Sequence, residues 1–200
     1  MLLKGGLFMD ELLKSLRDDM KKILKPSRYE HTLGVAYTAA NLAMRYEASI
    51  DDAIIAGLLH DNAKYVSDNE LIRICEENQL EISPLERKNA YLLHSKAGAI
   101  RARELYSIEN VDILNAITYH TTGRPGMSIL EKIVFVADYI EPNRRIIPNL
   151  NTIRKEAYLD LDKTVAMILS NTISYLRETK ELEDIDRATI DSYEYYRQKE

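Results

Sequence analysis

The residues of this sequence that could do chemistry are a few histidines and aspartates lying far apart along the chain. An apolar run over residues 53–59 ends abruptly in the pair His60-Asp61. The other candidates each fall near a predicted helix end or on an apolar helical face: His31, His94, His120 and Asp138. Buried polar groups are costly unless a partner compensates them, and a metal ion is the leading candidate. Imidazole with carboxylate suits Fe, Mn, Ni, Co or Zn, whereas a structural zinc site would need clustered cysteines.

Each of these residues also has an ordinary explanation when it is taken alone. Asp61 could simply end a helix, and His60 or His31 could be a core histidine bonded to a backbone carbonyl. His94 and His120 could be helix-end histidines that favour the negative end of the helix dipole. The separations between the histidines are too long for a local motif, so the metal-site hypothesis requires that the elements carrying them converge.

Asp138 is the strongest single case for a bound cation. It lies four residues after Val134, on an apolar face of a predicted helix. An unpaired carboxylate there would cost several kcal/mol, and Lys132, the nearest cation in the sequence, points elsewhere on that helix. Cys75, by contrast, is interpreted as inert packing.

The elements that must position these groups are predicted to be helices. Apolar residues recur at three- and four-residue spacing, while strand alternation and Asn-Gly or Asp-Gly hairpin turns are missing. Pro26 stops the first helix, and serines followed three residues later by glutamate predict capping boxes that open four others. The predicted helices cover residues 10–25, 27–46 and 51–60, start at Ser67 and at Ser83 (the latter leading to His94), cover 109–119, start at Ser128 and cover 160–177. Residues 141–149 are expected to be irregular.

The absence of repeats, low-complexity tracts and Gly/Ser linkers favours one domain. We expect residues 1–26 to form an N-terminal helix packed on the core, residues 27–178 to form the core, and residues 179–200 to form a charged tail of the same domain. Tyr193, Tyr195 and Tyr196 in that tail are expected to cap the core or a dimer surface.

Composition excludes several classes of function. A net charge of −5 without a long Lys/Arg run argues against a general nucleic-acid-binding protein. No apolar stretch approaches the ~20 residues of a membrane span, and one cysteine cannot make an intramolecular disulfide. With no signal-peptide pattern at the start, we expect a soluble cytoplasmic protein.

The order His, His-Asp, His, His, Asp on consecutive helices resembles the HD-domain metal-dependent phosphohydrolases, from about Ser27 to Arg145. Three segments resemble the YqeK branch of that superfamily, whose members are symmetrical diadenosine tetraphosphate hydrolases that release two ADP. These segments are HDNAK at residues 60–64, YHTTG at 119–123 and ADYIEPNR at 137–144. The resemblance implies an all-α fold, a single HD-domain helical bundle with a buried metal site.

Residue roles follow from the same resemblance. It implies that one metal ion, iron, is bound by four residues: His31, His60, Asp61 and Asp138. His94 and His120 would complete a second metal site or bind substrate phosphate, with Asp61 able to bridge. Mn, Co and Ni are the alternative metals. Such ions would neutralise phosphate charge and activate water for attack on phosphorus. The catalytic residues would be Asp61, Lys64, His94 and His120.

Three further residues are predicted to contact the substrate phosphates. Lys64 lies four residues beyond His60 and could project from the same side of a continued helix, or be a surface lysine. Arg144, chosen over Arg145 because the family pattern places its arginine there, could clamp phosphate oxygens in two places. Thr121 could donate a hydroxyl or amide, or only shape the turn. The acidic segment 179–185 differs from the less acidic loop of relatives, and would repel phosphate unless only its backbone is used.

We therefore expect hydrolysis of diadenosine tetraphosphate between its middle phosphates, with the nucleotide as substrate and ADP as product. The nearest alternative is another HD phosphohydrolase, such as a 5'-nucleotidase. A cyclic-dinucleotide phosphodiesterase of the HD-GYP type is disfavoured, because no Gly-Tyr-Pro follows the doublet. The alternative from another class is a non-catalytic helical interaction domain stapled by a metal. No nucleic-acid or membrane partner is expected, and a homodimer is left open.

Overall fold

The fold consists of helices packed around a central group that carries the histidines. The structure, a computed structural model, describes residues 2–179 and 185–199, with side chains over 9–179 and 185–198; residues 180–184 of the acidic segment lie outside this part of the chain. Its α-helices are α1 (Leu2–Ile23), α2 (Pro26–Arg45), α3 (Ile50–Leu59), α4 (Asp68–Glu77), α5 (Pro84–Lys88), α6 (His94–Tyr106), α7 (Val111–Tyr119), α8 (Ile129–Ile140), α9 (Leu150–Glu156), α10 (Leu161–Thr179) and α11 (Arg187–Tyr196). Short 3-10 helices cover Ala90–Leu93 (η1) and Arg197–Lys199 (η3). The described residues contain no strand, so the all-α prediction is confirmed.

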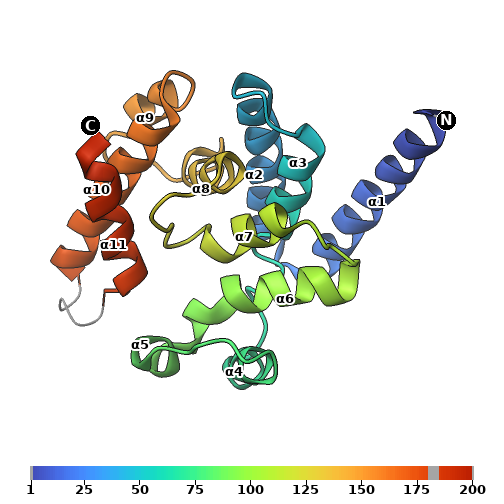
Figure 1. Ribbon diagram of the computed structural model, residues 1–200, viewed down its shortest axis with the longest axis horizontal. Coiled ribbons are helices and arrows are strands. Elements are labelled where there is room, and N and C mark those ends of the chain that lie inside the picture. Colours follow the sequence, from blue (N-terminus) through green and yellow to red (C-terminus); the bar gives the residue numbers. More distant parts are fainter. Residues whose placement is uncertain (1, 180–184, 200) are drawn as a thin grey trace.

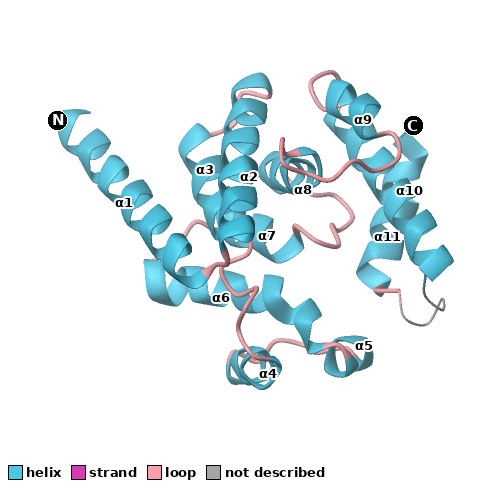
Figure 2. Ribbon diagram, turned by 180° about the vertical axis from the view of Figure 1, so that it is seen from behind, coloured by secondary structure: helices cyan, strands magenta, loops and turns pink. Residues whose placement is uncertain are grey.

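Helices α2, α3, α7 and α8 form the centre of the molecule (Figure 1), and the same arrangement is seen from behind (Figure 2). Helix α1 packs on one side, α9 to α11 on the other, and α4 to α6 lie below. Helix α3 is apolar on most sides, as predicted, because other helices enclose it. Its Gly57 lies so close to α2 that an added Cβ would meet the backbone of Ala36 at 2.7 Å.

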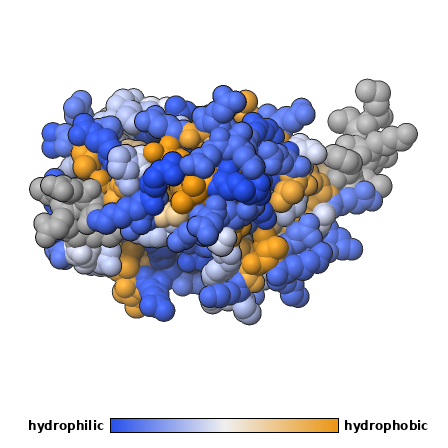
Figure 3. All heavy atoms as spheres, turned by 90° about the horizontal axis from the view of Figure 1, so that it is seen from below, coloured by the Kyte–Doolittle hydropathy of each residue, from blue (hydrophilic) through white to orange (hydrophobic). Residues whose placement is uncertain are grey.

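A second, smaller apolar cluster packs the lower helices together. It joins α4 to η1 and α6 through buried residues that include Leu71, Cys75, Leu93 and Ala97. On the lower face of the molecule, hydrophobic side chains form separate patches between hydrophilic ones (Figure 3). None of the described helices is long and apolar enough to cross a membrane.

The helix starts follow the predicted caps only in part. At Ser83 both halves of the capping box form, with Glu86 N–H donating to the serine and the glutamate accepting from Ser83 N–H. Ser67 begins α4 without a side-chain cap, and the predicted box at Ser27 is wrong. Helix α2 starts one residue earlier with Pro26 in its first turn, where the missing N–H costs nothing.

Three elements differ from the sequence-based expectations. His94 does not end the helix that starts at Ser83; α5 is short, and His94 begins α6 after η1. Helix α9 follows the irregular segment and was not predicted. The tail forms α11, in which Tyr196 is fully buried and its hydroxyl accepts a 3.0 Å hydrogen bond from Met127 N–H. Tyr196 therefore caps the core, as predicted for the terminal tyrosines.

Candidate active site

The four histidines converge from four helices into one row of rings. Ring centroids lie 5.4 Å apart for His31 and His60, 5.0 Å for His60 and His120, and 5.3 Å for His94 and His120. His31 comes from the second turn of α2, His60 and His120 follow the last residues of α3 and α7, and His94 begins α6. All four side chains are buried. The structure thus brings together histidines that the sequence separates by 89 residues at most.

Three of the rings are turned inward by the same local contact. Nδ1 of His60, His94 and His120 each lies 2.7 Å from the carbonyl oxygen three residues earlier. A carbonyl only accepts hydrogen bonds, so Nδ1 carries a proton in each ring, and Nε2 is the atom that can take up a second proton or bind a metal. These three Nε2 atoms face the carboxylate of Asp61.

Asp61 lies between two halves of the row. Its Oδ1 is 3.3 Å from His94 Nε2 and 3.7 Å from His120 Nε2, while Oδ2 is 3.3 Å from His60 Nε2. Burial alone would raise the pKa of Asp61, but the attraction of His60 and the contacts with His120 and His94 lower that pKa well below its ordinary value. Asp61 therefore stays ionised and offers one oxygen to each half.

Asp138 reaches the His31 end of the row from α8. Its Oδ1 lies 3.0 Å from His31 Nε2 and 4.0 Å from His60 Nε2. Burial would raise the pKa of Asp138, yet His31 and the two neighbouring histidines lower it below its ordinary value. Lys132 pairs with Asp162 at 2.7 Å, so it does point away from Asp138, as predicted.

The unsatisfied atoms at this centre fit a metal. Among the described residues, His31 Nε2, His60 Nε2 and Asp61 Oδ1 are buried and make no hydrogen bond, although charged neighbours approach them. Two sets of three ligand atoms, each within 4.8 Å of one another, could hold an ion: His31, His60 and Asp61, and Asp61, His94 and His120. Nitrogen and carboxylate ligands suit a divalent metal.

Two cations flank the shared aspartate. Arg28 Nη1 donates a 3.0 Å hydrogen bond to Asp61 Oδ2, and Lys64 Nζ lies 3.1 Å from His94 Nε2 and 3.7 Å from Asp61 Oδ1. Helix α3 ends before Lys64, but the turns that follow still bring it into the site. Arg28 was not among the predicted site residues. Its position three residues before His31 on the same helix is a signal that could have found it.

The structure does not bring Arg144 to this cluster. Its guanidinium lies over the ring of Tyr139, 5.5 Å from the centroid, and within the described part of the chain its side chain makes no ion pair with the site aspartates. The role of Arg144 in phosphate binding stays a prediction. Glu141, which was not predicted as a site residue, lies 3.1 Å from His31 Nδ1 through its Oε1.

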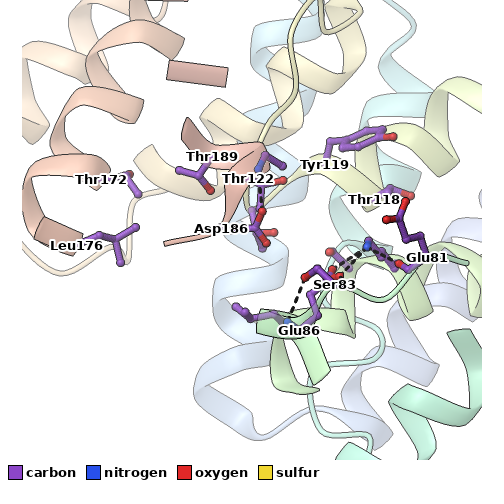
Figure 4. A pocket seen from close by; sticks show the side chains of 15 residues that line it. Glu81, Ser83, Glu86, Thr118, Tyr119, Thr122, Thr172, Leu176, Asp186 and Thr189 are labelled. Atoms are coloured by element: carbon purple, nitrogen blue, oxygen red, sulfur yellow. Dashed lines mark hydrogen bonds and ion pairs between the residues drawn. The ribbon is translucent and has the colours of Figure 1, made fainter. Parts of the chain in front are cut away.

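A cavity of about 380 Å³ is lined by residues that neighbour His94 and His120 in the chain (Figure 4). Tyr119 and Thr121, which flank His120, line it, and Leu92 and Ser95 line it near His94. Its far wall comes from α10 and α11, with Thr172, Leu176 and Thr189 pointing toward the opening between the elements. Lys96, also in the lining, is neutralised by Glu86 at 2.7 Å. The cavity thus offers hydroxyls, apolar surface and the acidic residues Glu81 and Asp186.

Comparisons with known proteins agree with this geometry. The sequence matches the HD domain family over residues 28–143. A relative from Halalkalibacterium halodurans, named bis(5'-nucleosyl)-tetraphosphatase, symmetrical, is 43% identical over 157 residues, covering 78% of this chain and 83% of the relative. A Bacillus subtilis protein of the same name is 40% identical with the same coverage. A solved structure from Clostridium acetobutylicum, described as a predicted HD superfamily hydrolase involved in NAD metabolism, superposes with a TM-score of 0.87 at 39% identity, covering 94% of this chain and 97% of that one.

Proposed function

The chain belongs to the HD domain family, and from this premise we propose that it hydrolyses diadenosine 5',5'''-P1,P4-tetraphosphate symmetrically to two ADP. The observation that carries the proposal is the division of Asp61 between two sets of buried ligands, which suits a phosphohydrolase with paired metal ions. The relatives named as symmetrical tetraphosphatases support the choice of substrate.

The metal ligands of the proposed site are the residues whose Nε2 or carboxylate atoms face one another. His31, His60 and Asp138 would hold one divalent ion, His94 and His120 the other, and Asp61 both. Iron is the proposed metal, with Mn, Co and Ni as alternatives. When bound, such ions supply Lewis acidity that neutralises phosphate charge and activates a water for attack on phosphorus.

The protein side chains supply the remaining charge. Arg28 and Lys64 lie on either side of Asp61, at 3.0 Å and 3.7 Å, with part of each side chain open to solvent. Once ions neutralise Asp61, both cations are available to the phosphate oxygens of the substrate. Arg28 is the better shaped of the two for holding two oxygens of one phosphate.

One nucleoside of the substrate is proposed to lie in the cavity beside His120. The threonine hydroxyls and the apolar lining suit the sugar and the flat face of a base. Thr121, which lines the cavity and follows His120 in the chain, would donate to the adjoining phosphate.

The decisive experiment is product analysis with metal-loaded protein. Purified protein is stripped of metal, reloaded anaerobically with Fe(II), and incubated with diadenosine tetraphosphate, AMP or NAD. We expect two ADP from the first compound and no turnover of the others. AMP plus ATP, inorganic phosphate from AMP, or no cleavage of the tetraphosphate would each contradict the proposal; phosphate from AMP would indicate a 5'-nucleotidase.

A thermal-shift measurement separates the enzyme from a metal-stapled interaction domain. If the protein is an enzyme, a slowly hydrolysed analogue of the dinucleotide should raise the melting temperature of the metal-loaded protein. If it is a metal-stapled interaction domain, Asp61→Asn should lower the melting temperature, and no nucleotide should change the melting temperature. The expected cytoplasmic location, the ADP product complex and a homodimer stay predictions.

A further inference from the structure

We propose that Glu141 is a positioning residue of the metal centre: it fixes the ring of His31, and Gly34 leaves the space in which its carboxylate lies. The inference rests on the metal site of the proposed function but not on the identity of the substrate. Its basis is that His31 is held differently from the other three histidines.

His31 cannot use the local contact that orients the other rings. His60, His94 and His120 lie at helix ends, where each ring turns back to a carbonyl three residues earlier. His31 lies within α2, where the preceding carbonyls accept hydrogen bonds from the helix itself. An acceptor from elsewhere in the fold is therefore needed for its Nδ1–H.

Glu141 supplies that acceptor from the end of α8. Its side chain is buried; Oε1 lies 3.1 Å from His31 Nδ1, and Oε2 accepts a 2.7 Å hydrogen bond from Asn143 N–H. Asp138, three residues earlier, lies 3.0 Å from the other ring nitrogen. With a metal ion at Nε2, Glu141 would hold Nδ1–H, which fixes the tautomer and makes the ring a stronger ligand.

Gly34 makes this contact possible. It lies three residues after His31 on α2, and a Cβ at this position would overlap the Glu141 carboxylate. The backbone of Glu141 is held by Arg154 Nη2, which donates to its carbonyl at 2.8 Å, so the carboxylate cannot simply retreat with the chain. Glycine is a poor helix former, and its place within α2 is accounted for by the room it leaves.

Two substitutions test the proposal without reference to catalysis. Glu141→Gln keeps the size of the side chain and removes its charge, and Gly34→Ala pushes the carboxylate aside while improving the intrinsic helix propensity of α2. Metal-free full-length proteins are titrated with Co(II) against a chelator, and the absorption spectrum and affinity of each ion are recorded. Gly98→Ala is the control, because an added Cβ there meets its nearest neighbour at 3.4 Å.

We expect one of the two ions to bind about 10- to 100-fold more weakly in Gly34→Ala and Glu141→Gln, as is typical when such a partner is lost. The other ion should keep its affinity in both variants, because its ligands lie away from Glu141. Unchanged affinities would overturn the proposal. Equal weakening of both ions with a lower melting temperature, or no metal binding by the wild type, would do the same. If the wild type binds metal but does not cleave the dinucleotide, the proposed function fails while this comparison stands.

Discussion

Arg28 Nη1 lies 3.0 Å from Asp61 Oδ2, so a cation from α2 contacts the carboxylate shared by both ligand sets. We predict that Arg28→Ala raises KM for the dinucleotide by about 10- to 100-fold, the value of a charge-assisted hydrogen bond of about 1.5–3 kcal/mol. Arg28→Lys should be intermediate, because an ammonium cannot contact two oxygens in a fork. Steady-state kinetics at saturating metal measure the effect.

The matched control is Arg45→Ala, which removes an exposed arginine from the other end of the same helix. Its KM should equal that of the wild type. If Arg28→Ala lowered the melting temperature and left KM unchanged, Arg28 would be only a structural partner of Asp61.

Asp61→Asn should abolish turnover with little change in helical content. The amide has the shape of the carboxylate but lacks the charge that holds two ions. Loss of several kcal/mol of transition-state stabilisation corresponds to about 10³-fold or more in rate. Turnover and bound metal per chain are measured together, with Asp162→Asn, a substitution on α10, as the active control. Retained activity in Asp61→Asn would exclude a bridging role.

The close approach of α2 and α3 predicts a stability effect at Gly57. A Cβ there would lie 2.7 Å from the Cα of Ala36, which is backbone and cannot turn aside. We expect Gly57→Ala to lower the free energy of unfolding by about 1–3 kcal/mol through overpacking, although alanine is the better helix former. Because α2 carries His31 and α3 leads into His60, metal affinity should fall as well.

Urea denaturation of the metal-free proteins measures the free energy of unfolding of Gly57→Ala and of the wild type. Gly98→Ala, with ordinary van der Waals room on α6, should be neutral or stabilising by up to about 1 kcal/mol. Equal stability of the two variants would mean that the helices separate at no cost.

We predict that the folded protein loses stability at high pH because the thiol of Cys75 is buried. Burial raises the pKa of its thiol to about 11, above the roughly 8.5 expected for an unfolded chain. A raised pKa in the folded state contributes stability that is fully present below about pH 8.5 and is lost as pH rises towards 11. Cys75→Ala should remove this part of the pH dependence. Alkylation at pH 9 should be slow in the native protein and fast in urea; rapid native alkylation would contradict the burial of Cys75.

Sequence spacing determined most of the helices and which residue types carry chemistry. Apolar periodicity depends on neighbours three and four residues apart. The sequence alone therefore predicted helix α3 and the inward face of α2 that carries His31. The pairing of Arg28 with Asp61 was not predicted, although its position on α2 contained a hint. The helix boundaries at Pro26 and His94 were also missed.

The tertiary structure decided what the separate helices make together. Only the packing of α3 against α2, α7 and α8, and of α6 against α7, turns the histidines into one row and gives each oxygen of Asp61 its own set of neighbours. Glu141 meets His31 across 110 residues, and Arg144, three residues further on, lies over Tyr139 instead of the site. Contacts over such separations depend on helix crossing and side-chain volume, which no local pattern encodes.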